Sequence, residues 1–298
     1  MRWNPFNTSV GLALGGGAAK GVAHIGVLKA FEEEGLKISY LSGTSIGSLV
    51  AAYYAFGKSI EEITAVGEQL TFKSITSFSW KKTGGFFTTS AVREMIIRDL
   101  GDVQIEDALI PLAICTTDIV TGEQVAFEKG SLADAVCASV AVPGLFAPVE
   151  INGRKLVDGG IVENVPVSLL GDLGAGISVA VNLNGVKHYP VPDGMLDVVS
   201  NAIDICMDQK TREQIKKADV VISLDLTSFN RTDNKERVHE LIEEGYRPTK
   251  EQISKVLWFK RTNYLHYLID LIRRIIPLKV PELIKLPFKP KLPSIKIK

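Results

Sequence analysis

The sequence predicts a layered α/β domain built around a largely parallel β-sheet. Two observations carry this prediction. Short apolar runs alternate along the chain with longer segments of helical periodicity, and a glycine-rich turn stands twice between such a run and the helix that follows it. This alternation is typical of parallel sheets, because a parallel strand pair needs a crossover connection. The 298 residues are enough for one large domain with an appendage.

The N-terminal part of the chain contains both of these strand–turn–helix units. Gly35 is a natural stop for the first helix, because glycine readily adopts positive φ. Residues 74–89 are rich in Ser, Thr, Phe and Gly and are predicted to form a loop. From the spacing of apolar residues, the predicted elements are strands at 9–14 and 38–41 and helices at 18–34, 49–56, 59–71 and 90–100.

The middle of the chain carries clear turn and capping signals. The pair Asn152-Gly153 favours a type I′ turn and predicts a hairpin over 148–157, which delivers the chain to Asp158. Ser131, with Asp134 three residues further on, is predicted to cap a short helix. The remaining predicted elements are strands at 111–117, 124–128, 176–182 and 220–226 and helices at 131–140 and 195–217.

The C-terminal end differs in composition, and we predict a domain over 1–258 followed by a basic, proline-rich extension over 259–298. From Trp258 onward the chain carries a net charge of +8, which leaves −8 on the rest. A helix predicted at 265–276 precedes five prolines, whose density excludes a continuous helix. Two interpretations stay open: the tail binds an anionic membrane surface, or it packs back onto the acidic body.

The bulk composition excludes several classes of protein. The formal net charge is zero, so no nucleic-acid partner is expected, and association into a homo-oligomer is left open. The three cysteines are far apart and form no C-x-x-C pair, which argues against a zinc site or a disulfide framework. The first nine residues lack the apolar core of a secretory signal, and no apolar run of about 18 residues predicts a spanning helix. A cytoplasmic protein is expected, attached peripherally to the inner face of the membrane if the tail binds lipid.

The strongest chemical signal is Gly43-Thr44-Ser45-Ile46-Gly47, placed between a strand and a helix. A nucleophilic serine needs a tight turn, and glycines on both sides allow that turn without side-chain clashes. The N-terminus of the following helix adds a favourable dipole for a developing oxyanion. A plain glycine turn is the alternative, which the strand-before and helix-after context makes weaker.

The glycine-rich segment 15–21 (GGGAAKG) also follows a strand and opens a helix. Phosphate-loop interpretations fail, because Lys20 stands where G-x-G-x-x-G needs glycine, and Val22 stands where a Walker A loop needs lysine. Consecutive glycines expose N–H groups that suit a negative oxygen, so an oxyanion hole is the better interpretation. Lys20 either holds this loop, faces an anionic headgroup, or is an ordinary solvated lysine.

A base for the serine is the third requirement, and Asp158-Gly159-Gly160 at the end of the hairpin supplies a candidate. An aspartate on a glycine-flanked turn can approach a serine directly; the alternative is a turn aspartate bonded to its own backbone. None of the four histidines lies in a recognisable motif. His24 is nearest the glycine loop but falls within a predicted helix, so a catalytic role for it is the weaker hypothesis.

The order of these motifs resembles that of the patatin-like phospholipases, in particular the bacterial members related to the neuropathy-target-esterase catalytic domain. The likeness runs from about Val10 to about Leu226. The matching segments are 15–21 (GGGAAKG), 24–28 (HIGVL), 43–47 (GTSIG), 138–146 (ASVAVPGLF) and 158–166 (DGGIVENVP).

This resemblance implies a three-layer α/β/α patatin-like fold and a Ser–Asp dyad without a catalytic histidine. By motif position, Ser45 is the nucleophile and Asp158 the general base, and neither a metal nor an organic cofactor is needed. The oxyanion hole falls on the N–H groups of Gly15, Gly16 and Gly17. The residues that support the motifs are Lys20, Gly21, Gly43, Gly47, Gly159 and Gly160.

The function implied is hydrolysis of acyl esters of phospholipids, lysophospholipids or other lipids through an acyl-enzyme. The family often has arginine where this chain has Lys20, so a bidentate role at that position is not implied. Two alternatives stay open: an acyltransferase that uses the same dyad, and a lipid-binding protein that has kept the fold without the chemistry.

Overall fold

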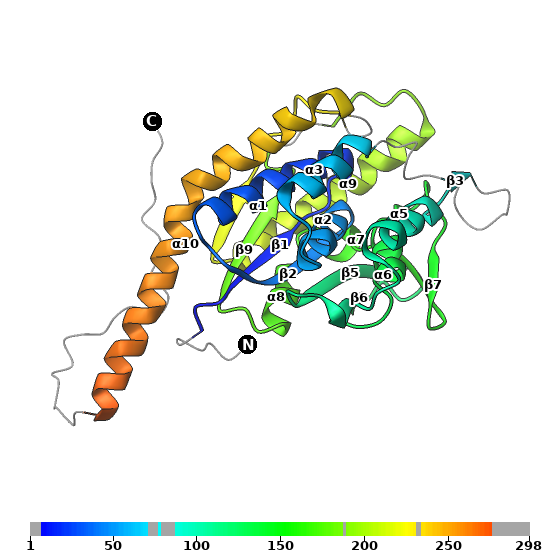
Figure 1. Ribbon diagram of the computed structural model, residues 1–298. Helices are drawn as coiled ribbons and strands as arrows, with labels where there is room; N and C mark the ends of the chain where they lie inside the picture. The colour runs from blue at the N-terminus through cyan, green and yellow to red at the C-terminus, as the bar shows by residue number, and fades with distance from the viewer. Residues whose placement is uncertain (1–6, 71–76, 79–86, 187–188, 231–233, 276–298) are drawn as a thin grey trace.

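A computed structural model describes residues 7–70, 77–78, 87–186, 189–230 and 234–275 (Figure 1). Most of the predicted loop over 74–89 and the proline-rich stretch from Ile276 lie outside these residues. Within them, two short strands, β3 (Ser77–Phe78) and β4 (Phe87–Thr88), pair antiparallel in the region predicted as loop.

The centre of the described chain is an eight-stranded sheet with the order β10-β9-β1-β2-β5-β8-β7, and β6 pairs with β5. The strands from β10 to β5 run parallel, whereas β6, β8 and β7 are antiparallel to their neighbours. The prediction of a largely parallel sheet is confirmed. The strands are β1 (Val10–Leu14), β2 (Ile38–Thr44), β5 (Leu112–Asp118), β6 (Gln124–Phe127), β7 (Val149–Ile151), β8 (Arg154–Asp158), β9 (Ile177–Asn182) and β10 (Val220–Ser223).

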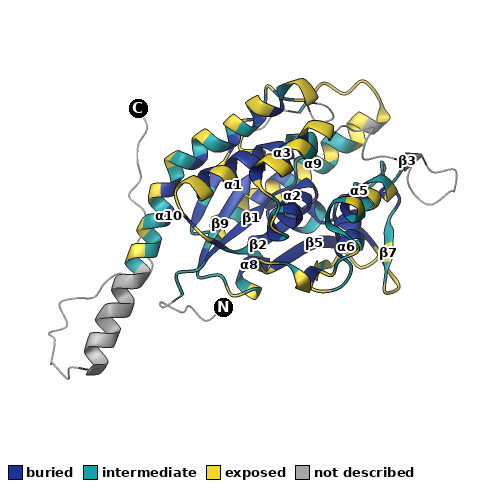
Figure 2. Ribbon diagram, viewed as in Figure 1, coloured by how far each residue is buried: buried dark blue, intermediate teal, exposed yellow. Residues whose placement is uncertain are grey.

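Helices cover both faces of this sheet. Alternate residues of β1 show the division: Leu12 and Leu14 pack in the large core with α1, α2 and α10, whereas Ala13 packs with α8. The parallel strands β1, β2, β5 and β9 are mostly buried between these layers, whereas the antiparallel strands β6 and β7 are partly exposed (Figure 2). The three-layer α/β/α prediction is confirmed. The helices are α1 (Ala23–Glu33), α2 (Ile46–Ala55), α3 (Ile60–Gln69), α5 (Ser90–Leu100), α6 (Leu132–Ser139), α7 (Gly160–Glu163), α8 (Val167–Asp172), α9 (Met195–Gln214) and α10 (Val238–Ile275).

Several local predictions hold in detail. Gly35 ends α1 with a φ of +62°, and the hairpin β7–β8 turns at Asn152 and Gly153, which both have positive φ. The Ser131 hydroxyl accepts the Asp134 N–H at the start of α6. Other boundaries differ: the first predicted helix begins as a 3₁₀ turn, η1 (Ala18–Val22), and the two short helices α7 and α8 were not predicted. Helices of four and six residues are too short to show helical periodicity.

Helix α10 crosses α1 at closely packed glycines. A Cβ atom on Gly26 would lie 1.8 Å from the Ile242 carbonyl oxygen, and one on Gly245 would lie 1.8 Å from the Ala23 oxygen. The two backbones therefore touch, and the N-terminal part of α10 belongs to the body of the domain. The helix continues through the predicted boundary at 258/259 to Ile275 and extends away from the body (Figure 1). Its last turns contain the predicted helix at 265–276 as far as Ile275.

Pro248 lies inside α10, although proline usually weakens a helix interior because it cannot donate the backbone hydrogen bond. No element was predicted between residues 226 and 265, and packing against α1 supplies the stabilisation that local sequence does not show. Among the described helices, none combines the length and the apolar character needed to cross a bilayer.

Candidate active site

Strand register brings Ser45 and Asp158 together. Thr44, the last residue of β2, pairs with Cys115 of β5, and the next residue of β5, Thr116, pairs with Asp158 of β8. Ser45 and Asp158 therefore flank the same level of β5 from opposite sides. Both side chains line one cavity, and Ser45 lies close enough to the Asp158 carboxyl to lower its pKa against the larger effect of burial.

Ser45 occupies a strained one-residue turn between β2 and α2. Its φ of 53° and ψ of −130° lie in a region that non-glycine residues rarely adopt. A Cβ on Gly43 would lie 2.5 Å from the Ser48 Cα, and one on Gly47 would lie 2.2 Å from the Leu14 carbonyl oxygen. Both glycines are thus required by contact with backbone. The turn is tighter than predicted, since the strand runs to Thr44 and the helix begins at Ile46 rather than Leu49.

The backbone of the turn at Ser45 is held by Ser139, at the end of α6. The Ser45 N–H donates to Ser139 Oγ at 2.8 Å, and the Ser139 hydroxyl donates to the Cys115 carbonyl at 2.7 Å. Ser139 is fully buried. It thereby ties the turn to β5, the strand that also positions Asp158. Ser139 belongs to the segment 138–146 (ASVAVPGLF), but no sequence pattern predicted its hydrogen bond with Ser45.

Replacing Ser139 by Ala is expected to lower both stability and turnover. The variant leaves the buried Ser45 N–H without its acceptor, which costs about 1–3 kcal/mol of unfolding free energy, and the loosened turn should lower kcat more than it raises KM. Denaturant unfolding and steady-state ester hydrolysis measure the two effects. Ser131→Ala, which removes a helix cap from the same helix, is the control: it should cost about 1 kcal/mol and leave kcat unchanged. Equal kcat values in both variants would contradict a positioning role for Ser139.

Asp158 sits at the end of β8 with only 4% of its surface exposed. Its pKa is raised from 3.8 to about 6, chiefly because burial disfavours the charged carboxylate. The neighbouring Ser45 side chain and a hydrogen bond from the Gly160 N–H lower this pKa, whereas the charge of Asp204 raises it further. The Gly160 N–H lies 2.7 Å from Asp158 Oδ1. The carboxyl group is thus ionised near neutral pH but close enough to its pKa to accept a proton.

The glycine loop corrects part of the predicted oxyanion hole. The Gly15 N–H donates to the Val181 carbonyl and the Gly16 N–H to the Asn164 carbonyl, each at 3.1 Å. These two N–H groups therefore hold the loop against neighbouring segments instead of pointing into the cavity. Among the acceptors of the described chain, the Gly17 N–H has no partner. Of the three predicted donors, only Gly17 is left for an oxyanion in this conformation.

His24 supports the glycine loop from behind. It is fully buried, and its Nε2–H donates to the Gly15 carbonyl at 2.8 Å. Burial lowers its pKa from 6.5 to about 4, so the ring is neutral at physiological pH. No contact with Ser45 or Asp158 is present among the described residues, which agrees with the weaker standing of His24 as a base.

The other predicted glycines act through close packing. A Cβ on Gly21 would lie 2.3 Å from Ile46, and one on Gly159 would lie 2.3 Å from the Cys115 carbonyl oxygen. A Cβ on Gly160 would meet the end of the Met207 side chain at 2.2 Å. These glycines let the loop, the helix α2 and strand β5 approach one another, and they do not line the cavity.

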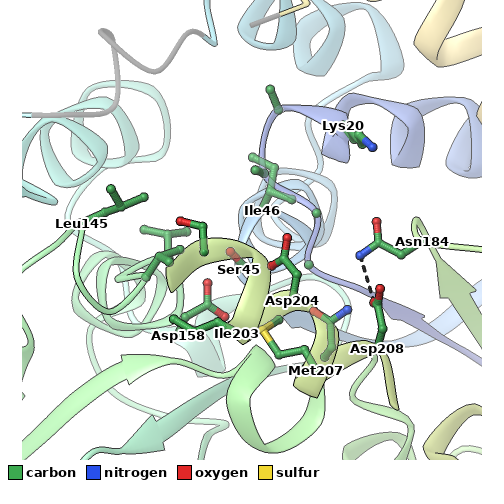
Figure 3. A pocket seen from close by; sticks show the side chains of 18 of the residues that line it. Lys20, Ser45, Ile46, Leu145, Asp158, Asn184, Ile203, Asp204, Met207 and Asp208 are labelled. Carbon is green, nitrogen blue, oxygen red and sulfur yellow. Dashed lines mark hydrogen bonds between the residues drawn. The ribbon is translucent and has the colours of Figure 1, made fainter. Parts of the chain in front are cut away.

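The cavity has a volume of about 320 Å³ and a mainly apolar lining. Figure 3 shows Ser45 and Asp158 with Asp204 of α9 nearby, whereas Lys20 and Asn184 lie further along. Hydrogen bonds from the Thr227 hydroxyl and N–H lower the pKa of Asp225, and the charge of the nearby Lys20 adds a smaller effect in the same direction. Asp208 accepts hydrogen bonds from Asn184 and Tyr189. The lining includes Ile46, Leu70, Val140, Val142, Leu145, Phe146, Ile161, Val186, Ile203 and Phe229.

The structure thus places five of the predicted residues on one cavity: Gly16, Gly17, Lys20, Ser45 and Asp158. Sequence reasoning missed the acidic residue Asp204 in the cavity lining. Asp204 reaches the cavity because α9 packs against α7, and no sequence motif marks it. Within the described part of the chain, no group of three His, Cys, Asp or Glu side chains is arranged to hold a metal ion.

Comparison with known proteins agrees with this architecture. Residues 12–170, more than half of the chain, match the patatin-like phospholipases. Because this match covers more than half of the chain, the chain belongs to the patatin-like phospholipase family.

Two curated relatives and one solved structure define the likeness further. An uncharacterised NTE family protein of Mycobacterium tuberculosis is 35% identical over 193 residues, which cover 64% of this chain and 53% of the relative. The lysophospholipase NTE1 of Coccidioides immitis is 34% identical over 199 residues, 64% of this chain but 12% of that protein. VipD from Legionella pneumophila aligns with a TM-score of 0.54 at 16% identity, over 84% of this chain and 67% of VipD, and shares the fold. The matched region thus spans about half the length of the mycobacterial relative and about an eighth of the length of the fungal one.

Proposed function

We propose that this protein hydrolyses acyl esters of lipids, with Ser45 as nucleophile and Asp158 as general base. The observation that most directly supports the proposal is the position of these two buried side chains beside each other at the wall of a mainly apolar cavity. Membership of the patatin-like phospholipase family and the lysophospholipase name of a relative support the lipid substrate class. The mainly apolar lining of the cavity suits an acyl chain.

The reaction follows from the geometry as two acyl transfers. Ser45 Oγ attacks the ester carbonyl carbon while its proton passes to Asp158. The tetrahedral intermediate collapses, the C–O bond to the alcohol breaks, and the departing alkoxide takes the proton from Asp158. Water then gives its proton to Asp158 and attacks the acyl-enzyme, and the fatty acid leaves as Ser45 regains a proton. Asp158 is ionised at the start of each half-reaction, which its pKa of about 6 permits at neutral pH.

Active-site labelling together with product analysis tests this proposal. The purified protein is incubated with a fluorophosphonate, and the modified residue is located by peptide mass spectrometry; adduct formation on Ser45 is expected. The same protein is incubated with lysophosphatidylcholine and with p-nitrophenyl acyl esters, and released fatty acid is measured. A labelled residue other than Ser45, or no fatty acid released above background, would refute the proposal. Added glycerol as a competing acceptor distinguishes hydrolysis from acyl transfer, since a transferase would form an acylglycerol.

We further propose that the basic extension over 259–298 binds an anionic membrane surface and places the enzyme at its substrate. The net charge of +8 from Trp258 onward supports this, because each basic residue near an anionic leaflet contributes on the order of 1 kcal/mol. This proposal corresponds to a cytoplasmic protein held peripherally on the inner face of the membrane.

Truncation after Lys260 is expected to abolish co-sedimentation with vesicles that contain phosphatidylglycerol. The truncated protein keeps the close approaches of Gly26 to Ile242 and of Gly245 to Ala23 that hold α10 on the body, so its hydrolysis of a soluble p-nitrophenyl ester should be unchanged. Sedimentation with pure phosphatidylcholine vesicles is the control, and little binding is expected for either protein. Unchanged sedimentation with anionic vesicles would instead favour the interpretation that the tail packs on the acidic body.

A further inference from the structure

Asn164 is a buried amide whose side chain has no hydrogen-bond partner. It follows α7 directly, is 1% exposed, and lies on the wall of the active-site cavity. Neither its Oδ1 nor its Nδ2 finds a partner among the described residues. Buried amide groups are nearly always satisfied, so one left open at the cavity wall needs a reason.

The amide lies between the nucleophile, the base and the glycine loop. A Cβ built on Gly16 would lie 2.6 Å from Asn164 Oδ1 and 3.2 Å from the Ser45 Cβ. A Cβ built on Gly160 would lie 3.1 Å from Asn164 Oδ1 and 3.1 Å from Asp158 Oδ1. The tip of Asn164 is therefore beside both groups that act on the ester.

The backbone of Asn164 is fixed, whereas the orientation of its amide is not. The Asn164 carbonyl accepts the Gly16 N–H at 3.1 Å, and the preceding carbonyl, that of Glu163, accepts the Thr44 hydroxyl at 2.9 Å. With no partner on either side-chain atom, the amide can turn about its last bond and present the Nδ2 donor to an oxygen bound in the cavity.

The glycine loop leaves a need for such a donor. Two of its three predicted N–H donors are engaged in holding the loop, and only Gly17 is free among the described acceptors. A tetrahedral oxyanion normally requires more than one aligned donor in a water-poor site. An amide side chain can fill that role as well as a backbone N–H group can.

We propose that the Asn164 side-chain amide donates through Nδ2–H to the oxyanion of the tetrahedral intermediate and is a catalytic residue. This assignment rests on the proposed ester hydrolysis at Ser45 and adds a donor to it. The amide is then unpaired in the free protein because its partner is the oxygen that becomes negative during the reaction.

The first test replaces Asn164 by Val and by Thr, which have nearly the same volume, while only Thr can donate a hydrogen bond. For Asn164→Val, kcat/KM should fall by about 10²–10³-fold, as for the loss of one oxyanion donor. Asn164→Thr should retain about tenfold more activity than the Val variant. The thermal midpoint of Asn164→Val should not fall, because the native side chain makes no hydrogen bond that the variant loses.

Asn182→Ala is the control for removal of a buried asparagine. Asn182 is 5% exposed at the end of β9, accepts the Asn184 N–H at 3.1 Å, and is not among the residues that line the cavity. This variant should show the reverse pattern, with a lower thermal midpoint and a kcat close to that of the wild type.

A second measurement separates oxyanion binding from a structural role. An alkyl boronic acid forms a tetrahedral adduct with the nucleophile, and its affinity should fall in Asn164→Val by a factor similar to the fall in kcat/KM. The affinity of a non-hydrolysable ether lysolipid, which has no carbonyl, should stay the same. Wild-type kcat/KM in the Val variant, or unchanged boronate affinity, would overturn the assignment to Asn164. Failure of the wild-type protein to hydrolyse any ester would instead overturn the proposed function.

Discussion

Ser45→Ala is expected to lower ester hydrolysis on the order of 10⁶-fold, as when the nucleophile of a serine hydrolase is removed. The effect is large because alanine has no hydroxyl group for Asp158 to deprotonate, so no acyl-enzyme can form. The fold should survive, since the Ser45 N–H still donates to Ser139. Measurement of kcat with a p-nitrophenyl acyl ester, beside circular dichroism, checks both statements. Ser178→Ala, at a partly buried serine of β9 whose hydroxyl bonds Asp219, should keep wild-type kcat.

Ser45→Gly separates the chemical role of the residue from its backbone strain. A residue with φ near +53° and ψ near −130° costs about 1–3 kcal/mol, which glycine avoids. After the entropy cost of glycine, about 0.5–1 kcal/mol, a net gain on the order of 1 kcal/mol over Ser45→Ala remains. Denaturant unfolding of the two inactive variants measures this difference. A glycine variant less stable than the alanine variant would contradict the strain.

Asp158→Asn is expected to lower kcat on the order of 10²–10⁴-fold and to stabilise the protein at pH 7.5. The raised pKa means that the native state holds the charged carboxylate at a cost. From 3.8 to about 6, at 1.36 kcal/mol per pKa unit, this cost is about 3 kcal/mol. Because the folded-state pKa of Asp158 is the higher one, its protonation favours the folded protein. This contribution to the unfolding free energy is complete below pH 3.8 and is lost as the pH rises through 6. The gain in the Asn variant should therefore be up to about 3 kcal/mol at pH 7.5 and should vanish near pH 4.

Unfolding midpoints at both pH values, together with the pH profile of the wild-type enzyme, check this prediction. Wild-type kcat/KM should fall below about pH 6 as Asp158 becomes protonated. Asp118→Asn is the matched control, since Asp118 is also buried next to β8 but holds a turn through the Val120 and Thr121 N–H groups. That variant should lose stability and keep its activity. Loss of stability at pH 7.5 in both variants would contradict the buried-charge cost at Asp158.

Much of the fold was predictable because its signals are local. The strand before each glycine turn and the Asn152-Gly153 hairpin both depend on residues that are neighbours in sequence. The glycine-flanked turn made Asp158 a candidate base, and the family resemblance implied its pairing with Ser45. In physical terms this pairing depends on the register of β2, β5 and β8, and no short-range pattern determines which strands become neighbours.

The parts that were missed depend on long-range contacts. Ser139 holds the turn at Ser45 through a hydrogen bond between residues 94 positions apart, and the Gly16 N–H is engaged by Asn164 from a distant loop. The glycine triplet suggested three free donors, because the sequence shows which N–H groups exist and not which acceptors reach them. The part of helix α10 before residue 265 was missed for a related reason: its contact with α1 compensates for Pro248.

The buried ring of His24 gives the stability of this protein an unusual dependence on acid. Its pKa of about 4 in the folded protein means that His24 takes up a proton on unfolding between about pH 4 and 6.5. The stability of the folded state therefore decreases at this group as the pH falls through that range. Over much of the same interval, unfolding releases a proton from Asp158. The two groups therefore change the unfolding free energy in opposite directions over this pH range, and the net pH dependence of the wild-type protein from these two groups is small. Once Asp158 is replaced by Asn, the histidine acts alone, and mild acid should weaken a protein that was more stable than its parent at neutral pH.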